Sequence, residues 1–546
     1  AGTQGIQGPT AFQGVQGLQG LEAQDPDVSA DTSPQLGGDL DVNGQSIVSV
    51  SNGNIQITPD GTGSVILDGL SYPADDGTNG QVLTTDGSGN LTFADASNFV
   101  LSTTTVDNPN AYGTSDNDRF GAEVAVSGNY AIVGARQEDD AGGLTSGKAY
   151  IFNVTTGALV HTLDNPNAYG TSAGDEFGYA VAISGNRVIV GARIEGDAGG
   201  AESGKAYIFN VTTGALVHTL DNPNASGTSA YDRFGSAVAI SGNYAIVGVY
   251  LEDDAGANSG KAYIFNVTTG ALVHTLDNPN AYDTSAGDAF GEFVTISGNY
   301  AIVNARSEDD AGGTSSGKVY IYDVASGNLL YTLDNPNAYG TSASDFFGNS
   351  IAMSGNYIIV GAYLEDDAGG TSSGKVYIYD VASGNLLYTL NNPNAFGTSF
   401  DDLFGSSVAM SGNYITVGAY TEDDAGGTSS GKAYIYDIST FTTSTISSAN
   451  YVLDNPNAYS TTTNDYFGNS VAISGNHVIV GAYGEDDAGA TDLSGKAYIF
   501  KIDAQPYAYT GSELSLFSDG ISLATLKTEV AASTSFADFQ TRIAAL

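Results

Sequence analysis

The middle of the chain alternates short apolar runs with small polar residues and shows no helical periodicity. In the stretch that follows Phe177, four runs rich in Val, Ile, Tyr and Ala are bounded by Gly, Asn, Ser or Asp, a pattern typical of short β-strands. We expect four strands, A to D, over Tyr179–Ser184, Arg187–Ala192, Lys205–Val211 and Ala215–Leu220.

This four-strand pattern is repeated seven times. Each repeat carries a Phe-Gly pair, at spacings of 57, 57, 56, 57, 57 and 63 residues, with an Asp two residues before the Phe. The seven aromatic residues are Phe120, Phe177, Phe234, Phe290, Phe347, Phe404 and Phe467. Such an array predicts an all-β fold, a seven-bladed β-propeller of four-stranded blades with each Phe buried between blades; a solenoid of the same period is the alternative.

The ends of the array predict a closed ring. The seventh unit ends with Lys496–Ile502 and has no strand D after it. Ahead of the first unit, Asn98–Thr104 resembles the missing strand. We expect this segment to complete the last blade, which removes both open sheet edges.

The repeat motif resembles a known family. The motif runs Asp-x-Phe-Gly-x-x-Val-Ala-x-Ser-Gly-Asn, Val-Gly-Ala, Asp-Asp-Ala-Gly and Ser-Gly-Lys-x-Tyr-Ile-Phe. It resembles the FG-GAP repeat in its bacterial form, over residues 98–504. The resemblance implies a propeller, but it assigns no function, because propellers serve binding, scaffolding and catalysis alike.

Residues 1–20 predict the end of a collagen-like stalk. Glycines at positions 2, 5, 8, 14, 17 and 20 share one register, broken only at Ala11. Only Gly fits at the axis of a collagen triple helix, so this reading implies a homotrimer whose longer stalk precedes Ala1. A flexible Gly/Gln linker is the alternative.

Residues 21–97 predict a β-rich connector with brief strand-like runs at Ile47–Val50, Ile55–Thr58 and Ser64–Leu67. The segments Leu36–Gly44 and Pro73–Leu83 resemble parts of bacteriophage tail-fibre proteins, notably those of phages that infect marine cyanobacteria. Residues 505–546 predict a tail with two short amphipathic helices, since apolar residues recur there at helical spacing. Those apolar residues are Leu523, Leu526 and Val530, then Phe536, Phe539, Ile543 and Leu546.

Charge narrows the range of partners. The chain carries 61 acidic and 16 basic residues, a formal net charge of −45. Such a surface repels nucleic-acid backbones and anionic lipid headgroups, so we expect no nucleic-acid partner. The sequence has no run of 18 apolar residues, so we also expect no membrane insertion. The chain lacks Cys, which excludes disulfides and thiolate metal sites.

No catalytic motif stands out, and we expect no enzymatic activity. Ser-His-Asp arrangements, phosphate-binding Gly loops and zinc spacings are missing. Three of the four histidines, His161, His218 and His274, share one repeat position, as structural residues do. An enzyme acting on polysaccharide is the alternative, but it would need paired carboxylates that differ from blade to blade.

Each B–C loop carries an acidic triplet, Glu-Asp-Asp in six blades, and Glu195-Gly196-Asp197 in the second. These loops share one face with the D–A loops, and clustered oxygen ligands suit Ca²⁺. The candidate ligands are Asp139, Asp140, Asp253, Asp254, Asp309, Asp310, Asp366, Asp367, Asp423, Asp424, Asp486 and Asp487. A solvated acidic rim is the alternative, because Ser-Gly-Asn replaces the family's calcium loop, Asp-x-Asp-x-Asp-Gly, between strands A and B.

These patterns together predict a structural or adhesive protein of an extracellular fibre. The leading interpretation is a trimeric phage tail fibre or virion appendage whose propellers contact a host-surface receptor, glycan or protein, or other virion proteins. A bacterial cell-surface or matrix filament adhesin is the alternative.

Overall fold

A computed structural model of the chain contains two units, Ala1–Asp95 and Ala96–Leu546. In the second unit it describes residues 103–109, 117–139, 143–167, 172–196, 200–224, 230–253, 256–279, 286–309, 313–336, 343–366, 370–393, 400–423, 428–456, 463–486 and 493–502. Elsewhere it describes only short strands: β1 (Ile66–Leu67), β2 (Leu70–Ser71), β3 (Gln81–Thr85), β4 (Leu91–Asp95), β34 (Tyr509–Thr510) and β35 (Glu513–Leu514).

These short strands form antiparallel pairs, β1 with β2, β3 with β4, and β34 with β35. The predicted run Ser64–Leu67 overlaps β1, whereas Ile47–Val50 and Ile55–Thr58 lie outside the described residues. The Gly triplets of residues 1–20 and the predicted tail helices also lie outside them.

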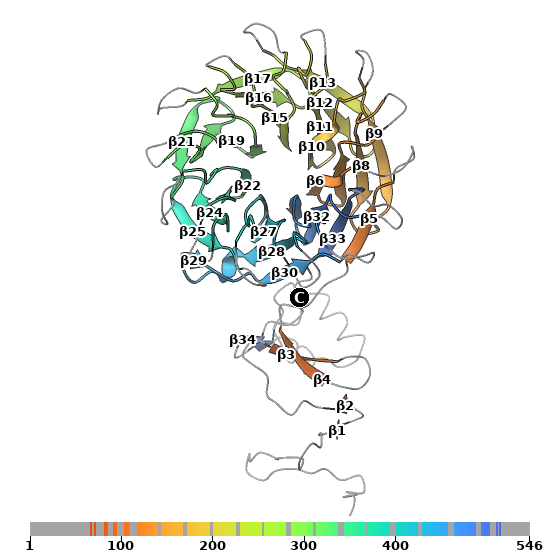
Figure 1. Cartoon of the computed structure of the whole chain (residues 1–546), viewed down its shortest axis with the longest axis vertical. Coiled ribbons are helices and arrows are strands. Elements are labelled where there is room, and N and C mark those ends of the chain that lie inside the picture. Colours follow the sequence, from red (N-terminus) through yellow and green to blue (C-terminus); the bar gives the residue numbers. More distant parts are fainter. Residues whose placement is uncertain are drawn as a thin grey trace, which may run out of the picture. The chain divides into compact units, whose positions relative to one another are not determined.

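Seven sheets surround one axis and form a seven-bladed propeller (Figure 1). The first three blades are β6 (Phe120–Ser127), β7 (Tyr130–Ala135), β8 (Lys148–Asn153) and β9 (Leu159–Asp164); β10 (Phe177–Ser184), β11 (Arg187–Ala192), β12 (Lys205–Asn210) and β13 (Leu216–Asp221); and β14 (Ala237–Ser241), β15 (Tyr244–Val249), β16 (Lys261–Asn266) and β17 (Leu272–Asp277). The next two are β18 (Val294–Ser297), β19 (Tyr300–Ala305), β20 (Lys318–Asp323) and β21 (Leu329–Asp334); and β22 (Ser350–Ser354), β23 (Tyr357–Ala362), β24 (Lys375–Asp380) and β25 (Leu386–Asn391).

The last two blades depart from the simple repeat. Blade 6 contains β26 (Ser407–Ser411), β27 (Tyr414–Ala419), β28 (Lys432–Asp437) and β30 (Tyr451–Asp454). Its long C–D connection holds the 3-10 helix η3 (Ile438–Thr440) and β29 (Thr445–Ile446), and β29 pairs in parallel with β25 of blade 5. This connection accounts for the 63-residue spacing. Blade 7 contains β31 (Val471–Ser474), β32 (His477–Ala482), β33 (Lys496–Lys501) and β5 (Thr103–Asp107).

The ring is closed by a strand from before the first repeat, as predicted, but the strand begins later than predicted. It is β5, which pairs with β33, and Lys496 donates to Asp107 at 2.6 Å. The predicted segment Asn98–Thr104 overlaps it only at Thr103 and Thr104. The register follows Val106, which is buried opposite Ala497 as Leu163 is opposite Ala149.

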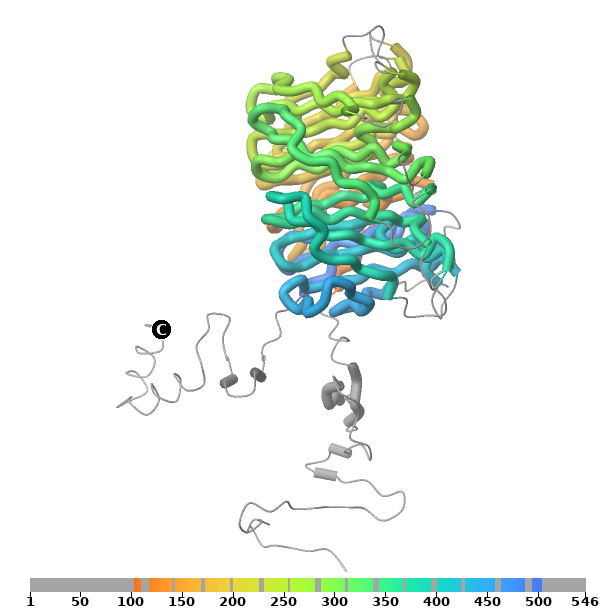
Figure 2. The backbone as a smooth tube through the Cα atoms, turned by 90° about the vertical axis from the view of Figure 1, so that its left-hand side faces the viewer, coloured from red at the N-terminus to blue at the C-terminus, as the bar shows by residue number. Residues whose placement is uncertain are grey.

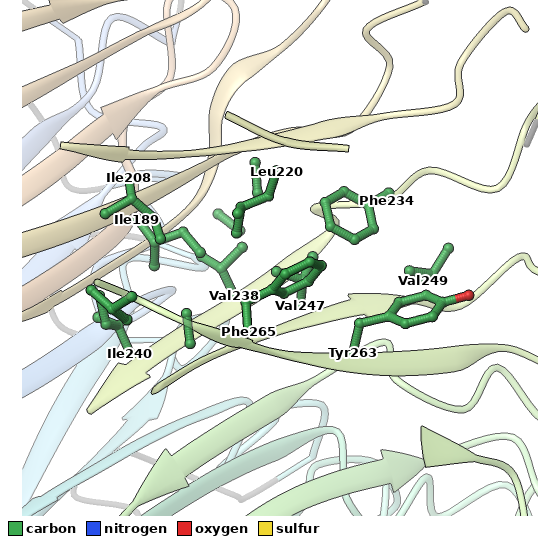
Figure 3. Close-up of a cluster of buried hydrophobic side chains, with 14 residues drawn as sticks. Ile189, Ile208, Leu220, Phe234, Val238, Ile240, Val247, Val249, Tyr263 and Phe265 are labelled. Atoms are coloured by element: carbon green, nitrogen blue, oxygen red, sulfur yellow. The ribbon is translucent and has the colours of Figure 1, made fainter. Parts of the chain in front are cut away.

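The core consists of seven apolar clusters, each shared by two neighbouring blades. In the cluster between blades 2 and 3, Phe234 lies among side chains of both sheets (Figure 3). All seven Phe residues of the Phe-Gly pairs are fully buried, which confirms their predicted place between blades. Each ring also contacts two aromatic rings of strand C, as Phe234 does with Tyr263 and Phe265.

The Gly of each Phe-Gly pair allows the blades to approach closely. Gly178 has a φ of +89°, and a Cβ placed there would lie 2.3 Å from the carbonyl oxygen of Lys148. A Cβ on the facing Gly134 would lie 2.2 Å from the carbonyl oxygen of Gly178. Only Gly therefore fits at either side of this contact.

The two faces of the disc differ (Figure 2). Because successive strands are antiparallel, the A–B and C–D turns share one face and the B–C and D–A loops share the other. We call these the turn face and the loop face. Thr103, at the start of β5, lies opposite Phe500, near the end of β33, so both ends of the ring leave from the turn face.

Candidate functional site

The acidic B–C loops do not present three acids to solvent. The first acid of each triplet is a Glu with no exposed surface. In blade 1 the Glu138 carboxylate accepts a hydrogen bond from Tyr150 on β8, at 2.6–2.7 Å. The same pair occurs in every blade, as Tyr207–Glu195, Tyr263–Glu252, Tyr320–Glu308, Tyr377–Glu365, Tyr434–Glu422 and Tyr498–Glu485. The sequence alone placed this Glu in a surface cluster, and that placement is wrong.

Burial changes the protonation of these carboxyls. Desolvation raises the pKa of Glu138 and of Glu485 to about 8, and hydrogen bonds from Tyr150 and Tyr498 only partly offset it. Desolvation likewise raises the pKa of Glu195 and of Glu308 to about 7. These four groups are therefore partly or largely neutral at pH 7, which reduces the charge that the fold must bury.

The other repeated polar motifs build a support around this Glu. Asn165 of Asn-Pro-Asn donates to Asp175, the buried acid before Phe-Gly, at 2.8 Å. Equivalent Asn–Asp bonds of 2.7–2.9 Å occur in the other six blades. The Lys of Ser-Gly-Lys contributes as well: Lys205 pairs with Asp221 at the end of strand D, whereas Lys375 pairs with Glu365 itself. A structural role therefore accounts for Asn-Pro-Asn, for the Asp before Phe-Gly and for Ser-Gly-Lys.

The second acid of the triplet holds its own loop. Asp139 accepts a hydrogen bond from the backbone N–H of Thr145 at 2.8 Å. Asp253, Asp309, Asp366 and Asp423 accept equivalent bonds from the N–H of Asn258, Ser315, Ser372 and Ser429. Asp486, the second acid of blade 7, is half-buried. The third acid of each Glu-Asp-Asp triplet lies outside the described residues; these are Asp140, Asp254, Asp310, Asp367, Asp424 and Asp487. Within the described ranges, no three His, Cys, Asp or Glu side chains are grouped as metal ligands.

Calcium binding by these loops stays a prediction, and thermal unfolding tests it. If Ca²⁺ binds only the folded state, millimolar CaCl₂ should raise the melting temperature above that in NaCl of matched ionic strength. Blade 2 is the internal control, because Gly196 replaces its middle acid. Equal melting temperatures in the two salts would contradict the calcium sites and favour a solvated acidic rim.

The repeated histidines join neighbouring blades. The Nε2 atom of His161 lies 3.0 Å from the carbonyl oxygen of Thr212, in the C–D turn of the next blade. His218 and His274 make the same contact with Thr268 and Ala325. This arrangement agrees with the structural role predicted for them.

The blades are not equivalent around the central axis, where a cavity of about 430 Å³ opens among the A strands of the seven sheets and the residues that follow strand B. The residue that directly follows strand B varies from blade to blade. We call this set the Arg–Tyr ring: Arg136, Arg193, Tyr250, Arg306, Tyr363, Tyr420 and Tyr483. Five of its members line the cavity, all except Arg193 and Tyr250.

The ring has a charged arc, with arginines in blades 1, 2 and 4. The Arg193 guanidinium pairs with Glu176 at 2.7 Å and lies 3.6 Å from the centroid of Tyr179. Arg306 pairs with Glu292 and donates to Asn349. Desolvation raises the pKa of Glu292 above its ordinary value. It raises the pKa of Glu123, which lines the cavity, to about 7.

An aromatic arc completes the ring in blades 5 to 7. Tyr483 stacks on Tyr466, with centroids 5.1 Å apart and planes 13° from parallel. Tyr420 also contacts Tyr466, and Tyr363 contacts Phe346. The ring was not among the predicted sites, because those sites were chosen from residues that repeat in every blade. The sequence feature that marks the ring is a position that varies among the repeats between Arg and Tyr, directly after strand B.

The described residues contain no helix long and apolar enough to cross a membrane.

No curated protein matches the chain. A family model described as FG-GAP repeat matches it seven times, at residues 110–152, 167–209, 224–265, 280–322, 337–379, 395–436 and 458–500. Each match covers strands A to C of one blade and includes the buried Phe. The chain belongs to the FG-GAP repeat family.

Proposed function

We propose that this chain is a structural and adhesive component of an extracellular fibre, a trimeric phage tail fibre or virion appendage whose propellers contact a host surface. The observation that carries the proposal is the asymmetry of the disc. Both ends of the ring leave from the turn face, so tethers attached there would leave the loop face directed outward.

The loop face also carries the side chains expected of a contact surface. Leu144, in a B–C loop, is 72% exposed, and Tyr231 and Phe400, in D–A loops, are 60% and 59% exposed. Exposed large apolar residues at loop tips suit recognition of a partner, because their burial on binding is favourable. The ring closes its own edges, so it needs no partner to protect its sheets.

Location and mass test the architecture. Gold-labelled antibodies against the propeller should mark fibres on phage particles from the natural source, and native mass spectrometry of the natural protein should show three copies per assembly. Label on bacterial cell surfaces instead would favour the filament-adhesin alternative. A monomeric natural protein would contradict the trimer, whereas a monomeric propeller alone would be consistent with it.

Attachment to bacterial cells from the same source tests the role of the loop face. The double variant Leu144→Ser/Phe400→Ser should lose most attachment, because both side chains lie on the loop face. Leu159→Ser is the matched control: Leu159 is 44% exposed but lies on β9, the outer strand of blade 1. Equal attachment by the two variants would contradict the assignment of the contact surface.

A further inference from the structure

The central cavity combines residues that repeat in every blade with residues that vary from blade to blade. Strand A begins, and strand B ends, at the loop face, so residues at the start of A and directly after B lie near the same mouth of the channel. Deeper along strand A, all seven blades contribute an equivalent apolar residue to the lining. These residues are Val124, Val181, Val238, Val294, Ile351, Val408 and Val471.

Most of the arginines of the chain lie around this mouth. The chain has only seven arginines, of which Arg136, Arg193 and Arg306 belong to the Arg–Tyr ring. Two more, Arg119 and Arg233, stand next to Phe-Gly and contact ring members: Arg119 lies 5.7 Å from the centroid of Tyr483, and Arg233 donates to Tyr250. Three of these five are paired with a carboxylate, Arg193 with Glu176, Arg233 with Glu202 and Arg306 with Glu292. Arg136, which lines the cavity and has no such ion pair among the described residues, is therefore the guanidinium best placed to bind an anion.

Two of these arginines have N–H groups that find no hydrogen-bond acceptor in the described part of the chain. The Arg136 guanidinium lies 5.0 Å from the centroid of Tyr179 and near Glu123, but it donates no hydrogen bond to the residues described. The Nε atom of Arg119 is buried without a hydrogen-bond partner in that same part of the chain. A buried donor without a partner is costly, so a ligand acceptor at this position would relieve the cost.

The backbone next to the mouth also holds side chains where glycine would be easier. The residue before each Phe-Gly has a φ between +52° and +61° in every blade, although none of the seven is Gly. Left-handed conformations are uncommon for such residues and tend to occur at functional sites. Five of them contact members of the Arg–Tyr ring: Arg119, Glu176, Arg233, Phe346 and Tyr466.

We propose that this cavity binds an acidic saccharide, one sugar unit carrying a carboxylate or sulfate group together with an uncharged neighbour. The guanidinium of Arg136 would bind the anionic group through parallel N–H donors. The tyrosines of the opposite arc present ring faces and hydroxyls, which suit the apolar C–H faces and hydroxyls of a sugar. A cavity of about 430 Å³ falls within the usual range for small-molecule sites.

The surroundings favour a single anionic group over a highly charged polymer. Asp139, Asp253, Asp309, Asp366 and Asp423 all lie in loops of the same face. A polyanion lying across that face would meet these carboxylates and be repelled, whereas one charged sugar can enter the axial mouth. This proposal rests on the proposed adhesive function and names the chemistry that the loop face would recognise.

Isothermal titration calorimetry on the whole chain tests it with three disaccharides: one bearing a single glucuronate, one bearing a single sulfate, and neutral cellobiose. We expect one site per chain for at least one acidic probe, because the cavity lies on the axis, and much weaker binding of cellobiose. Which acidic probe binds distinguishes carboxylate from sulfate. Failure of both acidic probes to bind would overturn the proposal.

Substitutions at Arg136 localise the site. Arg136→Gln should weaken binding by at least about tenfold, as expected for loss of hydrogen bonds to a charged group. Arg136→Lys should recover only part of the affinity, because it keeps the charge but not the planar fork. The matched control is Arg187→Gln, since Arg187 begins β11 at the turn face and should leave binding unchanged. Equal affinities of the two Gln variants, both shown to be folded by thermal unfolding, would overturn the assignment.

The cell-attachment experiment separates this proposal from the broader one. Attachment to cells without binding of either acidic disaccharide would reject the saccharide site and leave the adhesive function standing. Binding of an acidic disaccharide by a chain that attaches to no cell would support the cavity site and reject the adhesive function.

Discussion

Phe290→Ala should destabilise the propeller by about 3–5 kcal/mol, the range for truncating a large buried aromatic side chain. Phe290 is fully buried among side chains of blades 3 and 4, and its ring centroid lies 5.8 Å from that of Tyr320 and 6.4 Å from that of Tyr322. Close packing on both sides leaves little room for the cavity to collapse, so the cost should fall in this range. Urea unfolding of the whole chain measures it.

Phe400→Ala is the matched control for this prediction. Phe400 is the same residue type but is 59% exposed in a loop, so its loss should change the free energy of unfolding by less than about 0.5 kcal/mol. A cost below about 1 kcal/mol for Phe290→Ala would show that the Phe-Gly aromatic ring is not an essential part of the contact between blades.

Glu138→Gln should stabilise the protein at high pH and change little at low pH. The folded-state pKa of Glu138 is about 8, above its ordinary value of 4.5. For an acid whose pKa is raised by folding, the folded state holds the proton more tightly than the unfolded state, so stability falls as pH rises from about 4.5 to about 8. Gln mimics the protonated carboxyl and still accepts a hydrogen bond from Tyr150, so it avoids this loss.

We expect Glu138→Gln to exceed the wild type by about 2–4 kcal/mol at pH 8.5, since each unit of pKa shift corresponds to about 1.4 kcal/mol. At pH 5 the two proteins should be nearly equally stable. Unfolding free energies at both pH values measure the effect. The matched control is Asp323→Asn: Asp323 lies in an exposed C–D turn, and hydrogen bonds from Ser326 lower its pKa, so this change should not stabilise the protein at pH 8.5. A Glu138→Gln variant that is less stable than the wild type at pH 8.5 would contradict a neutral buried carboxyl.

Much of the fold follows from local pattern repeated along the chain. Strand B of blade 2 was predicted residue for residue as Arg187–Ala192, because Ser-Gly-Asn before it and polar residues after it mark both ends. Strand D of blade 2 begins and ends one residue later than predicted, where its pairing with strand C is irregular near Phe209. The closing strand begins several residues later than predicted, because its ends depend on a partner distant in the sequence. Val106 sets the register of the closing strand only when it pairs with Ala497, which lies at the other end of the repeat array in the sequence.

The candidate site was harder to predict from the sequence than the fold, for a physical reason. An acidic residue in a loop has the same sequence signature whether it faces solvent or a buried Tyr hydroxyl, so Glu138 and Asp139 could not be separated by pattern alone. The Arg–Tyr ring is a clearer case, since its members are at least 56 residues from one another in the sequence and differ in residue type from blade to blade. Repetition in the sequence determines that seven blades form; closure of those blades around one axis brings Arg136, Arg306 and Tyr483 to a single cavity, and only that closure can do so.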